Sequence, residues 1–266
     1  MKLHRRLMKM KSGIRKARRN MKRNTIGHRM SILKRISDVI HAHSSFVASC
    51  HIRPEGDAIG SMLAITHALR EMGKICDPIS TDGVPKYCQF LPGSEWVRKR
   101  AKRRDYEIAI VLDTDGEHRI ALPKSVLERV KLVINIDHHT GDNAFGDINW
   151  VETTAAATGE MIYKLLRYIN APISQEIATC LYAAIATDTG TFRFDNTSPQ
   201  SLRIAAELVK AGAKPWEAAH HIFESRPANV LQLWGYALTR IQIDESAGIA
   251  WTSLKREHFN STDTTD

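Results

Sequence analysis

The apolar residues of this chain form two kinds of pattern that alternate along the sequence. Short continuous apolar runs lie at residues 45–50, 108–112 and 132–136, with a shorter candidate at 76–79. Runs of this length, rich in β-branched residues and bounded by polar ones, are typical of buried β-strands. Between them, residues 58–72 repeat apolar positions every three or four residues, which predicts an amphipathic helix.

Helical periodicity dominates the second half of the chain. Apolar stripes between residues 161 and 185 predict two successive helices. Ser198 and Pro199 begin another, because proline is favoured at the first position of a helix. We expect a last helix at about residues 229–241 and a strand at 248–254. Strands that alternate with helices predict an α/β fold with a mainly parallel sheet flanked by helices.

Charge is distributed unevenly along the chain. The 266 residues carry a net charge of +9, but residues 1–29 alone hold 12 Lys and Arg and no acid, which leaves −3 for the remainder. This extension could bind nucleic acid phosphates, act as an organelle presequence, or precede a true start at Met30. We expect a disordered tail or a start-site artefact, since the segment lacks apolar periodicity and aromatic residues for base stacking. A second basic run, residues 98–104, is expected to be the solvated face of a helix.

The cysteines indicate a reducing environment. Cys50, Cys76, Cys88 and Cys180 are spaced too widely for a zinc knuckle or a redox pair. Buried free thiols are the expected interpretation, which favours a cytoplasmic protein. No run approaches the roughly 18 apolar residues of a membrane span, so no membrane partner is expected.

Side chains that can bind metal follow three of the predicted strands. His51 comes after the first, Asp113 after the second, and Asp137-His138-His139 after the third. Because the carboxyl ends of parallel strands share one edge of a sheet, these side chains are expected to converge. Further acids are expected at the same edge: Glu55, Asp57 and Asp188.

Such a cluster of carboxylates favours a cation site. Neighbouring carboxylates raise one another's pKa unless a positive charge neutralises them. A mixture of carboxylate and imidazole suits Mn²⁺, with Mg²⁺ or Co²⁺ as alternatives, and about six ligands suffice for two ions. A single His or Asp at a strand end is more often a satisfied side chain, a cap or a turn residue. The interpretation as a cation site therefore depends on finding such residues at the ends of several strands.

Four segments resemble, in order and spacing, the motifs of the DHH phosphoesterase superfamily. They are His51-x-x-Pro54-Glu55-Gly56-Asp57-Ala58-x-Gly60-Ser61, Leu112-Asp113-Thr114-Asp115, Asp137-His138-His139 and Thr187-Asp188-Thr189-Gly190. The resemblance spans about residues 31–245. It is nearest to the nanoRNase A type, the oligoribonuclease and pAp-phosphatase proteins.

The resemblance implies a site for two manganese ions. The implied ligands are His51, Glu55, Asp57, Asp113, His138 and Asp188. Asp113 would bridge both ions and take part in catalysis, and His139 would face the scissile phosphate as a catalytic and substrate-binding residue. Asp137 would orient a neighbouring histidine. Ser61, near a helix start, and Arg193 would contact substrate phosphate, with helix capping and a surface ion pair as their respective alternatives.

The chain departs from the family pattern in two places. Glu55 stands where the family usually has Asp; it is one methylene longer and still an oxygen ligand. The Gly-rich, His-containing loop of the family's C-terminal DHH-associated domain has no counterpart after residue 226. We therefore expect a basic extension at 1–29, a DHH catalytic domain at 30–225, and a linker helix with an incomplete C-terminal domain at 226–266.

The resemblance implies a metal-dependent phosphoesterase that hydrolyses short oligonucleotides or pAp (3′-phosphoadenosine 5′-phosphate) with a water activated by two metal ions. A cyclic dinucleotide is the alternative substrate. An alternative of another class is a weakly active or inactive protein that binds metal or nucleotide, which the incomplete C-terminal domain motivates. A homodimer, and a nonspecific nucleic acid contact by residues 1–29, stay open.

Overall fold

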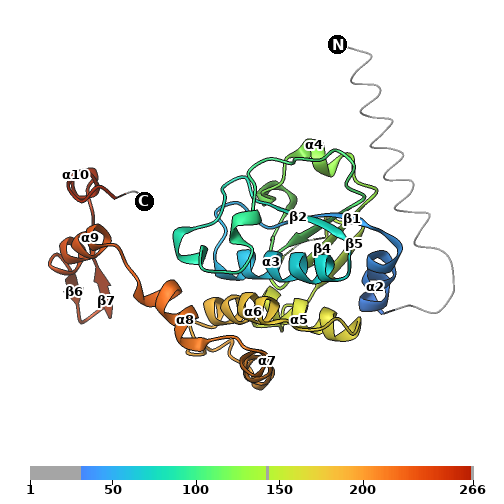
Figure 1. The fold of residues 1–266 in the computed structure, drawn as a ribbon. Helices are drawn as coiled ribbons and strands as arrows, with labels where there is room; N and C mark the ends of the chain where they lie inside the picture. Colours follow the sequence, from blue (N-terminus) through green and yellow to red (C-terminus); the bar gives the residue numbers. More distant parts are fainter. Residues whose placement is uncertain (1–30, 142–143, 265–266) are drawn as a thin grey trace, which may run out of the picture.

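A five-stranded parallel sheet forms the centre of the molecule (Figure 1). The computed structural model describes residues 31–141 and 144–264 of the 266. The strands, in their order across the sheet, are β2 (Ile75–Ile79), β1 (Ser45–Ser49), β3 (Ile108–Leu112), β4 (Leu132–Asp137) and β5 (Ile148–Val151). The expected α/β class is confirmed, and the four predicted strands are present. The fifth, β5, was missed because its four residues, Ile-Asn-Trp-Val, are too few for a clear period.

Helices cover one face of this sheet. They are α2 (Ile32–Ala42), α3 (Gly56–Glu71), α5 (Thr158–Tyr168) and α6 (Gln175–Asp188). Their apolar side chains share one core with Phe46 and Ala48 of β1, whereas Val47 between them belongs to a smaller core on the other face. That face is covered by the short helix α4 (Lys124–Leu127) and the segments around it. The sheet is therefore buried on both sides, which explains its continuous apolar runs.

Serine and proline residues mark the helix starts in the second half of the chain. Ser174 accepts a hydrogen bond from the backbone N–H of Ile177 and caps α6. Helix α7 (Pro199–Lys210) begins with a capping box at Ser198 and proline at its first position, as the sequence predicts. Helix α8 (Pro215–Ala219) continues into the π-helical turn η4 (His220–Glu224).

Two glycines of α3 let it approach α6 closely. A Cβ on Gly60 would lie 2.5 Å from the carbonyl oxygen of Cys180, and one on Gly56 would overlap the side chain of Thr187. Side chains at either position would push the two helices apart. The close approach matters for the site, because α3 carries Asp57 in its first turn and α6 ends at Asp188.

The C-terminal residues stand apart from the sheet and its helices in Figure 1. We call residues 228–264 the C-terminal module. It contains α9 (Ala228–Leu238), an antiparallel pair of β6 (Gln242–Asp244) and β7 (Ile249–Trp251), and α10 (Arg256–Ser261). The helix and the second strand correspond to the two predicted elements. The division into domains at residue 226 stays a prediction, and the basic extension lies outside the described residues.

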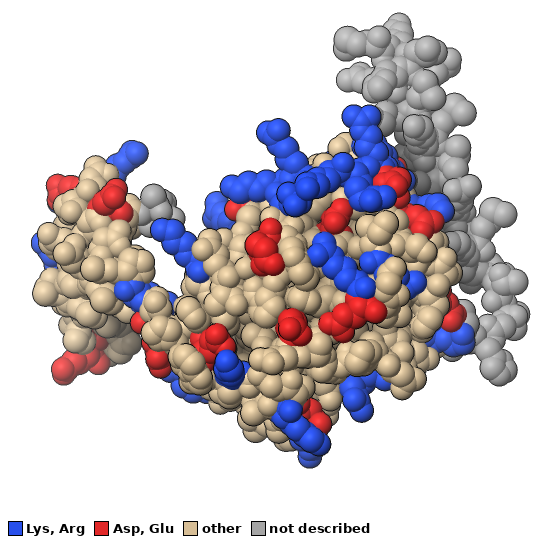
Figure 2. Space-filling view, in the orientation of Figure 1, with Lys and Arg blue, Asp and Glu red and all other residues tan. Residues whose placement is uncertain are grey.

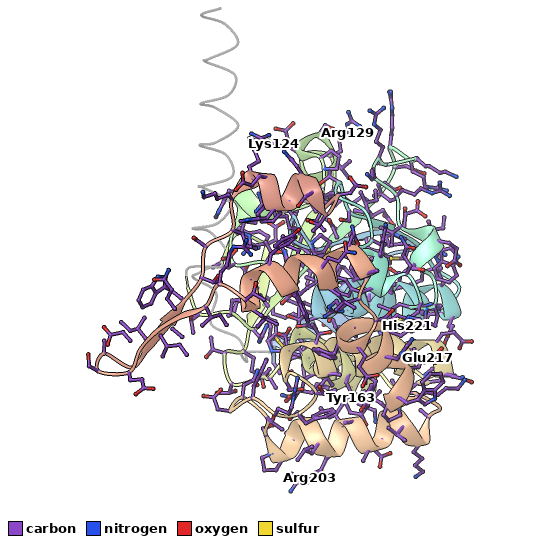
Figure 3. The ribbon with its side chains drawn as sticks, turned by 90° about the vertical axis from the view of Figure 1, so that its left-hand side faces the viewer. Lys124, Arg129, Tyr163, Arg203, Glu217 and His221 are labelled. Atoms are coloured by element: carbon purple, nitrogen blue, oxygen red, sulfur yellow. The ribbon has the colours of Figure 1, made fainter. Side chains whose placement is uncertain are left out.

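The basic run at residues 98–104 is not a helix, so that expectation is wrong. Arg98 instead forms an isolated bridge with Ile79, and its backbone bonds to Pro78 and Ser80 hold it in an extended conformation beside β2. Tertiary pairing thus overrides the local preference. Lys and Arg side chains gather at the end of the molecule around α4 (Figure 2), where Lys124 and Arg129 lie opposite Arg203 of α7 (Figure 3). None of the helices in the described residues combines the length and apolar character that crossing a bilayer needs.

Candidate metal centre

The carboxyl edge of the sheet brings together the six side chains that the motifs imply as ligands. His51 follows β1, Asp113 follows β3, and His138 follows β4. Two groups of three residues have ligand atoms within 4.8 Å of one another. The first group is His51, Glu55 and Asp113, and the second group is Asp57, His138 and Asp188.

The first group lies where β1 passes into α3. The Nδ1 of His51 is 2.7 Å from the carbonyl oxygen of Ile52, which leaves Nε2 directed at Glu55, 2.8 Å away, and at Oδ2 of Asp113, 3.6 Å away. Glu55 is the N-cap residue of α3 but makes no side-chain cap, so its carboxylate is free to face His51. This side chain is 41% exposed.

The second group is held by the N-terminus of α5. Asp57 is fully buried and accepts hydrogen bonds from the backbone N–H groups of Thr158, at 2.6 Å, and Gly159, at 2.9 Å. Ser61 donates a third bond at 2.9 Å. Unpaired N–H groups at a helix start favour an anion, so α5 stabilises the ionised form of Asp57 in a place where burial opposes it.

His138 joins the second group to Asp113. Its Nε2 lies 3.1 Å from Oδ2 of Asp188 and 3.5 Å from Oδ1 of Asp113, while its Nδ1 is 3.3 Å from the carbonyl oxygen of Ala155. The two carboxylate oxygens of Asp113 thus face different groups: Oδ2 toward His51, and Oδ1 toward His138. Asp113 lies between the groups and has a positive φ of 55°, a conformation that is uncommon for residues other than glycine.

The pKa values reflect this concentration of acids. Burial, with Asp113 and Asp188 nearby, raises the pKa of Asp57 well above its ordinary value. Burial acts to lower the pKa of His138, but the neighbouring carboxylates, led by Asp113 and Asp188, outweigh it and raise that pKa to about 11. For His51, Asp113 and Glu55 likewise overcome burial and raise the pKa to about 10. The clustered carboxylates therefore give the centre a strongly negative electrostatic potential, which attracts positive charge.

Two buried atoms of the centre are available as metal ligands. Oδ2 of Asp113 and Nε2 of His138 are buried and have no hydrogen-bond partner among the described residues. Such orphaned atoms are costly unless another partner satisfies them. Carboxylate oxygens and imidazole nitrogens are ligands of Mn²⁺, Mg²⁺ and Co²⁺. The residues present can bind metal, with Asp113 placed to contact an ion in either group.

His139 lies at the open side of the centre. Its side chain is 40% exposed, and its Nδ1 is 2.7 Å from Oδ1 of the buried Asp137. This contact raises the pKa of His139, against the opposing effect of burial. The arrangement orients the ring through Nδ1, and it gives Asp137 the place beside a histidine that the motif implies. His139 also forms a possible third ligand group with Asp113 and His138.

Ser61 and Arg193, the other two residues expected to contact substrate phosphate, make hydrogen bonds within the protein. Ser61 is fully buried, and its hydroxyl donates to Asp57 instead of facing an open site. Arg193 is exposed, and its Nε donates to the carbonyl oxygen of Gly190 at 2.6 Å. Ser61 therefore supports a ligand candidate, and the structure gives Arg193 no contact with the six ligand candidates.

Sequence reasoning missed two residues that hold the centre. Thr158 is fully buried, and its hydroxyl donates to Oδ1 of Asp113 at 3.0 Å while its N–H donates to Asp57. Arg119 pairs with Asp115 at 3.1 Å and has Nη2 3.4 Å from Nδ1 of His51. Thr158 follows a run of three alanines, and this small-residue approach to a helix start was the available signal.

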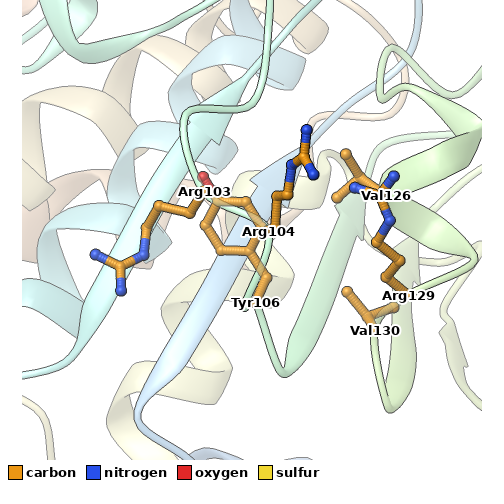
Figure 4. Close-up of a pocket in the computed structure, with 6 residues that line it drawn as sticks. All are labelled: Arg103, Arg104, Tyr106, Val126, Arg129 and Val130. Carbon is orange, nitrogen blue, oxygen red and sulfur yellow. The ribbon is translucent and has the colours of Figure 1, made fainter.

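A small basic hollow lies away from these ligands. It is lined by Arg103, Arg104, Tyr106, Val126, Arg129 and Val130 (Figure 4). Its volume of about 10 Å³ suits about one water molecule. It is therefore too small for a substrate.

Comparison with known proteins agrees with the motifs. The N-terminal domain of the DHH family matches residues 45–185, which is more than half of the chain. The chain belongs to the DHH family. The bifunctional oligoribonuclease and PAP phosphatase NrnA of Thermus thermophilus is 33% identical over 220 residues, which cover 79% of this chain and 63% of that protein. The protein of the same name in Bacillus subtilis is 27% identical over 231 residues, which cover 85% of this chain and 71% of the relative.

Solved structures support the DHH fold. An exopolyphosphatase-related protein from Bacteroides fragilis superposes with a TM-score of 0.83 at 24% identity, over 89% of this chain and 73% of that one. A putative family II inorganic pyrophosphatase from Methanococcus jannaschii gives a TM-score of 0.55 at 16% identity, over 83% and 75% of the two chains. The DHH chain described here spans less than two thirds of the length of its Thermus relative.

Proposed function

We propose that this DHH protein is a metal-dependent phosphoesterase that hydrolyses short oligonucleotides, pAp, or both. The observation that carries the proposal is the pair of ligand groups on either side of Asp113, whose Oδ2 faces His51 and whose Oδ1 faces His138, with buried atoms on Asp113 and His138 that make no hydrogen bond among the described residues. Two cations at such a centre would lower the pKa of a water and neutralise charge that develops on a phosphate. The names of the Thermus and Bacillus relatives support the substrate class.

The chain's own residues supply positioning and a proton. Asp113, fixed by Thr158 at 3.0 Å, would place its two oxygens toward the two groups. His139 is 40% exposed at the open side of the centre, and its protonated ring would donate a proton to a phosphate oxygen or to the leaving oxygen. Asp137 holds Nδ1 of this ring and favours its protonated form. Asp57 is fully buried, so this ligand of the second group is shielded from water.

Mn²⁺ is the ion we propose for both groups, because imidazole and carboxylate ligands occur together in each. Mg²⁺ and Co²⁺ are the alternatives to compare. We also propose a cytoplasmic location, since Cys50, Cys76, Cys88 and Cys180 are all buried free thiols. We further propose that the protein forms a homodimer, which a measurement of its molecular mass in solution would test. We also propose that residues 1–29 contact nucleic acid, which the salt dependence of nucleic acid binding would test.

The test is hydrolysis by the purified chain. We expect release of phosphate from pAp and of mononucleotide from a diribonucleotide with Mn²⁺, and little release from cyclic di-AMP. Asp113→Ala should abolish both activities. Preferred hydrolysis of cyclic di-AMP would favour the alternative substrate. Binding of Mn²⁺ without turnover of any of the three would contradict the enzyme and favour a metal- or nucleotide-binding protein.

A further inference from the structure

A groove of about 740 Å³ opens beside the metal centre, between the short 3-10 helix η1 (Lys86–Cys88) and the turn η4. Residues that line it include Lys86, Tyr87, Thr187, His221, Phe223 and Arg226. This volume is in the range of sites for small molecules and cofactors, about 300–1,000 Å³. We call it the η1–η4 groove. No role has been given to it so far.

Three residues connect the groove to the ligand groups. Thr187 precedes Asp188 in the chain, and its side chain packs against Gly56, which lies between Glu55 and Asp57. Tyr87 lies close enough to the first group for Glu55 to act on it: burial first, then Cys88 and Glu55, raise the pKa of Tyr87 to about 12. Through Thr187 the groove borders both the end of α6, which carries Asp188, and the start of α3, which carries Asp57.

Two cations of the groove lack acidic partners. Lys86 is exposed and forms no ion pair among the described residues. Arg226 donates from Nη1 only to backbone carbonyl oxygens, of Ile222 at 2.9 Å and of Ser225 at 3.2 Å. These backbone bonds fix the guanidinium without neutralising it. The groove thus offers two positive charges to an anion, beside a centre that would hold cations of its own.

Aromatic rings form part of the wall. His221 stacks on Phe90, with ring centroids 4.6 Å apart and planes inclined by 13°. Phe223 and Tyr87, which both line the groove, are half-buried against the main core. Aromatic faces of this kind stack with nucleobases irrespective of sequence.

We propose that the η1–η4 groove is a nucleotide subsite of the metal centre. The base and sugar lie against Tyr87 and Phe223, and a second phosphate, one nucleoside removed from the scissile one, lies between Lys86 and Arg226. The proposal rests on the proposed phosphoesterase function and sharpens it: the protein selects nucleotides that carry two phosphates over those that carry one. Both pAp and a 5′-phosphorylated dinucleotide meet this requirement.

Equilibrium binding tests the subsite. We would titrate pAp, 5′-AMP and adenosine into the full chain by calorimetry, with Ca²⁺ as the added ion, and compare Lys86→Ala and Arg226→Ala with the matched variants Lys124→Ala and Arg203→Ala. The control cations are exposed and remote from the groove (Figure 3). We expect the chain to bind pAp at least ~10-fold more tightly than AMP, because a charge-assisted contact to the second phosphate is worth about one tenfold step. Either groove variant should lower the pAp-to-AMP affinity ratio at least ~5-fold, and neither control should change it.

The aromatic wall has its own test. Tyr87→Ala should lower the affinity for pAp about 10-fold, and Tyr87→Phe should lower it about 2-fold or less, since stacking needs the ring. Equal affinities for pAp and AMP in the unaltered chain, or an unchanged ratio in both Lys86→Ala and Arg226→Ala, would overturn the subsite. Hydrolysis of bis(4-nitrophenyl) phosphate with Mn²⁺, which needs no nucleoside, reports on the proposed function separately. Its absence together with selective pAp binding would refute the phosphoesterase and leave the subsite intact.

Discussion

The two ligand groups of the metal centre differ in how firmly the chain holds them. Asp57 of the second group is fully buried and accepts three hydrogen bonds, two of them from the start of α5. Glu55 of the first group is 41% exposed, and its one close contact is with His51. Fixed ligands lose little conformational freedom when an ion binds, whereas an exposed glutamate must give up several rotamers. The second group therefore contains the most firmly fixed carboxylate, Asp57, and the first contains the most adjustable one, Glu55; for this reason we call the second group the preorganised half of the centre and the first the adjustable half.

The difference between the two groups explains how the first can accommodate Glu55, which is one methylene longer than Asp. In a group as tightly packed as the second, one additional methylene would displace its neighbours. In the first group the carboxylate reaches His51 from the N-cap position of α3 through open space. We expect the ion of the second group to bind more tightly, and the ion of the first group to exchange more readily. Variants of the two groups should expose this order.

The largest effect should come from Asp113, the residue between the groups. Asp113→Asn removes the negative charge that faces both His51 and His138, so hydrolysis of pAp should fall by roughly 10³-fold or more, and Mn²⁺ should bind at no more than one of the two groups. Metal stoichiometry by calorimetry and initial rates would measure this. Asp195→Asn, a change at an exposed position, is the matched control. Two tightly bound ions in Asp113→Asn would show that the groups are independent.

The comparison itself is tested by two variants that each remove one charge. Asp57→Asn leaves three donors facing an amide that can satisfy fewer of them, so Mn²⁺ affinity at the second group should fall by about 100-fold. Glu55→Gln should weaken only the first group, by about 10-fold, and Glu55→Asp by less. Competition with a chelator, followed for the first and second ion separately, would resolve the two constants. A greater loss in Glu55→Gln than in Asp57→Asn would reverse the assignment of the preorganised half.

The ligand candidates could be predicted from the sequence because their signal is topological. His51, Asp113 and His138 each follow a run of apolar residues, and parallel strands bring their carboxyl ends together regardless of side-chain detail. The same reasoning could not find Thr158, because its contact with Asp113 spans 45 residues and depends on where α5 begins. The helix expected at residues 98–104 failed for a related reason: the bridge between Arg98 and Ile79 is tertiary.

The groove was also beyond sequence reasoning. Lys86 and Arg226 are 140 positions apart, and neither belongs to a motif. They line one groove because η1 contacts η4, which Arg226 follows closely in the chain. A sequence motif consists of residues that one type of reaction needs at fixed spacing along the chain. The residues that select a substrate can come from any segment that the fold brings beside the motif, so they have no fixed spacing.

Ser61 provides the smallest effect and separates two interpretations of one residue. A hydroxyl near the start of α3 suggested phosphate binding from the sequence, whereas in the structure it is buried and donates to Asp57 at 2.9 Å. Ser61→Ala should weaken Mn²⁺ at the second group about 10-fold, the lower limit for residues that orient a ligand, and leave the first group unchanged. Ser61→Thr, which keeps the hydroxyl but adds a methyl group in a packed site, is the companion variant. The KM for pAp at saturating Mn²⁺ decides between the two roles. If Ser61 orients Asp57, the KM of Ser61→Ala should equal that of the unaltered chain. A raised KM with normal metal affinity would show instead that Ser61 contacts the substrate phosphate.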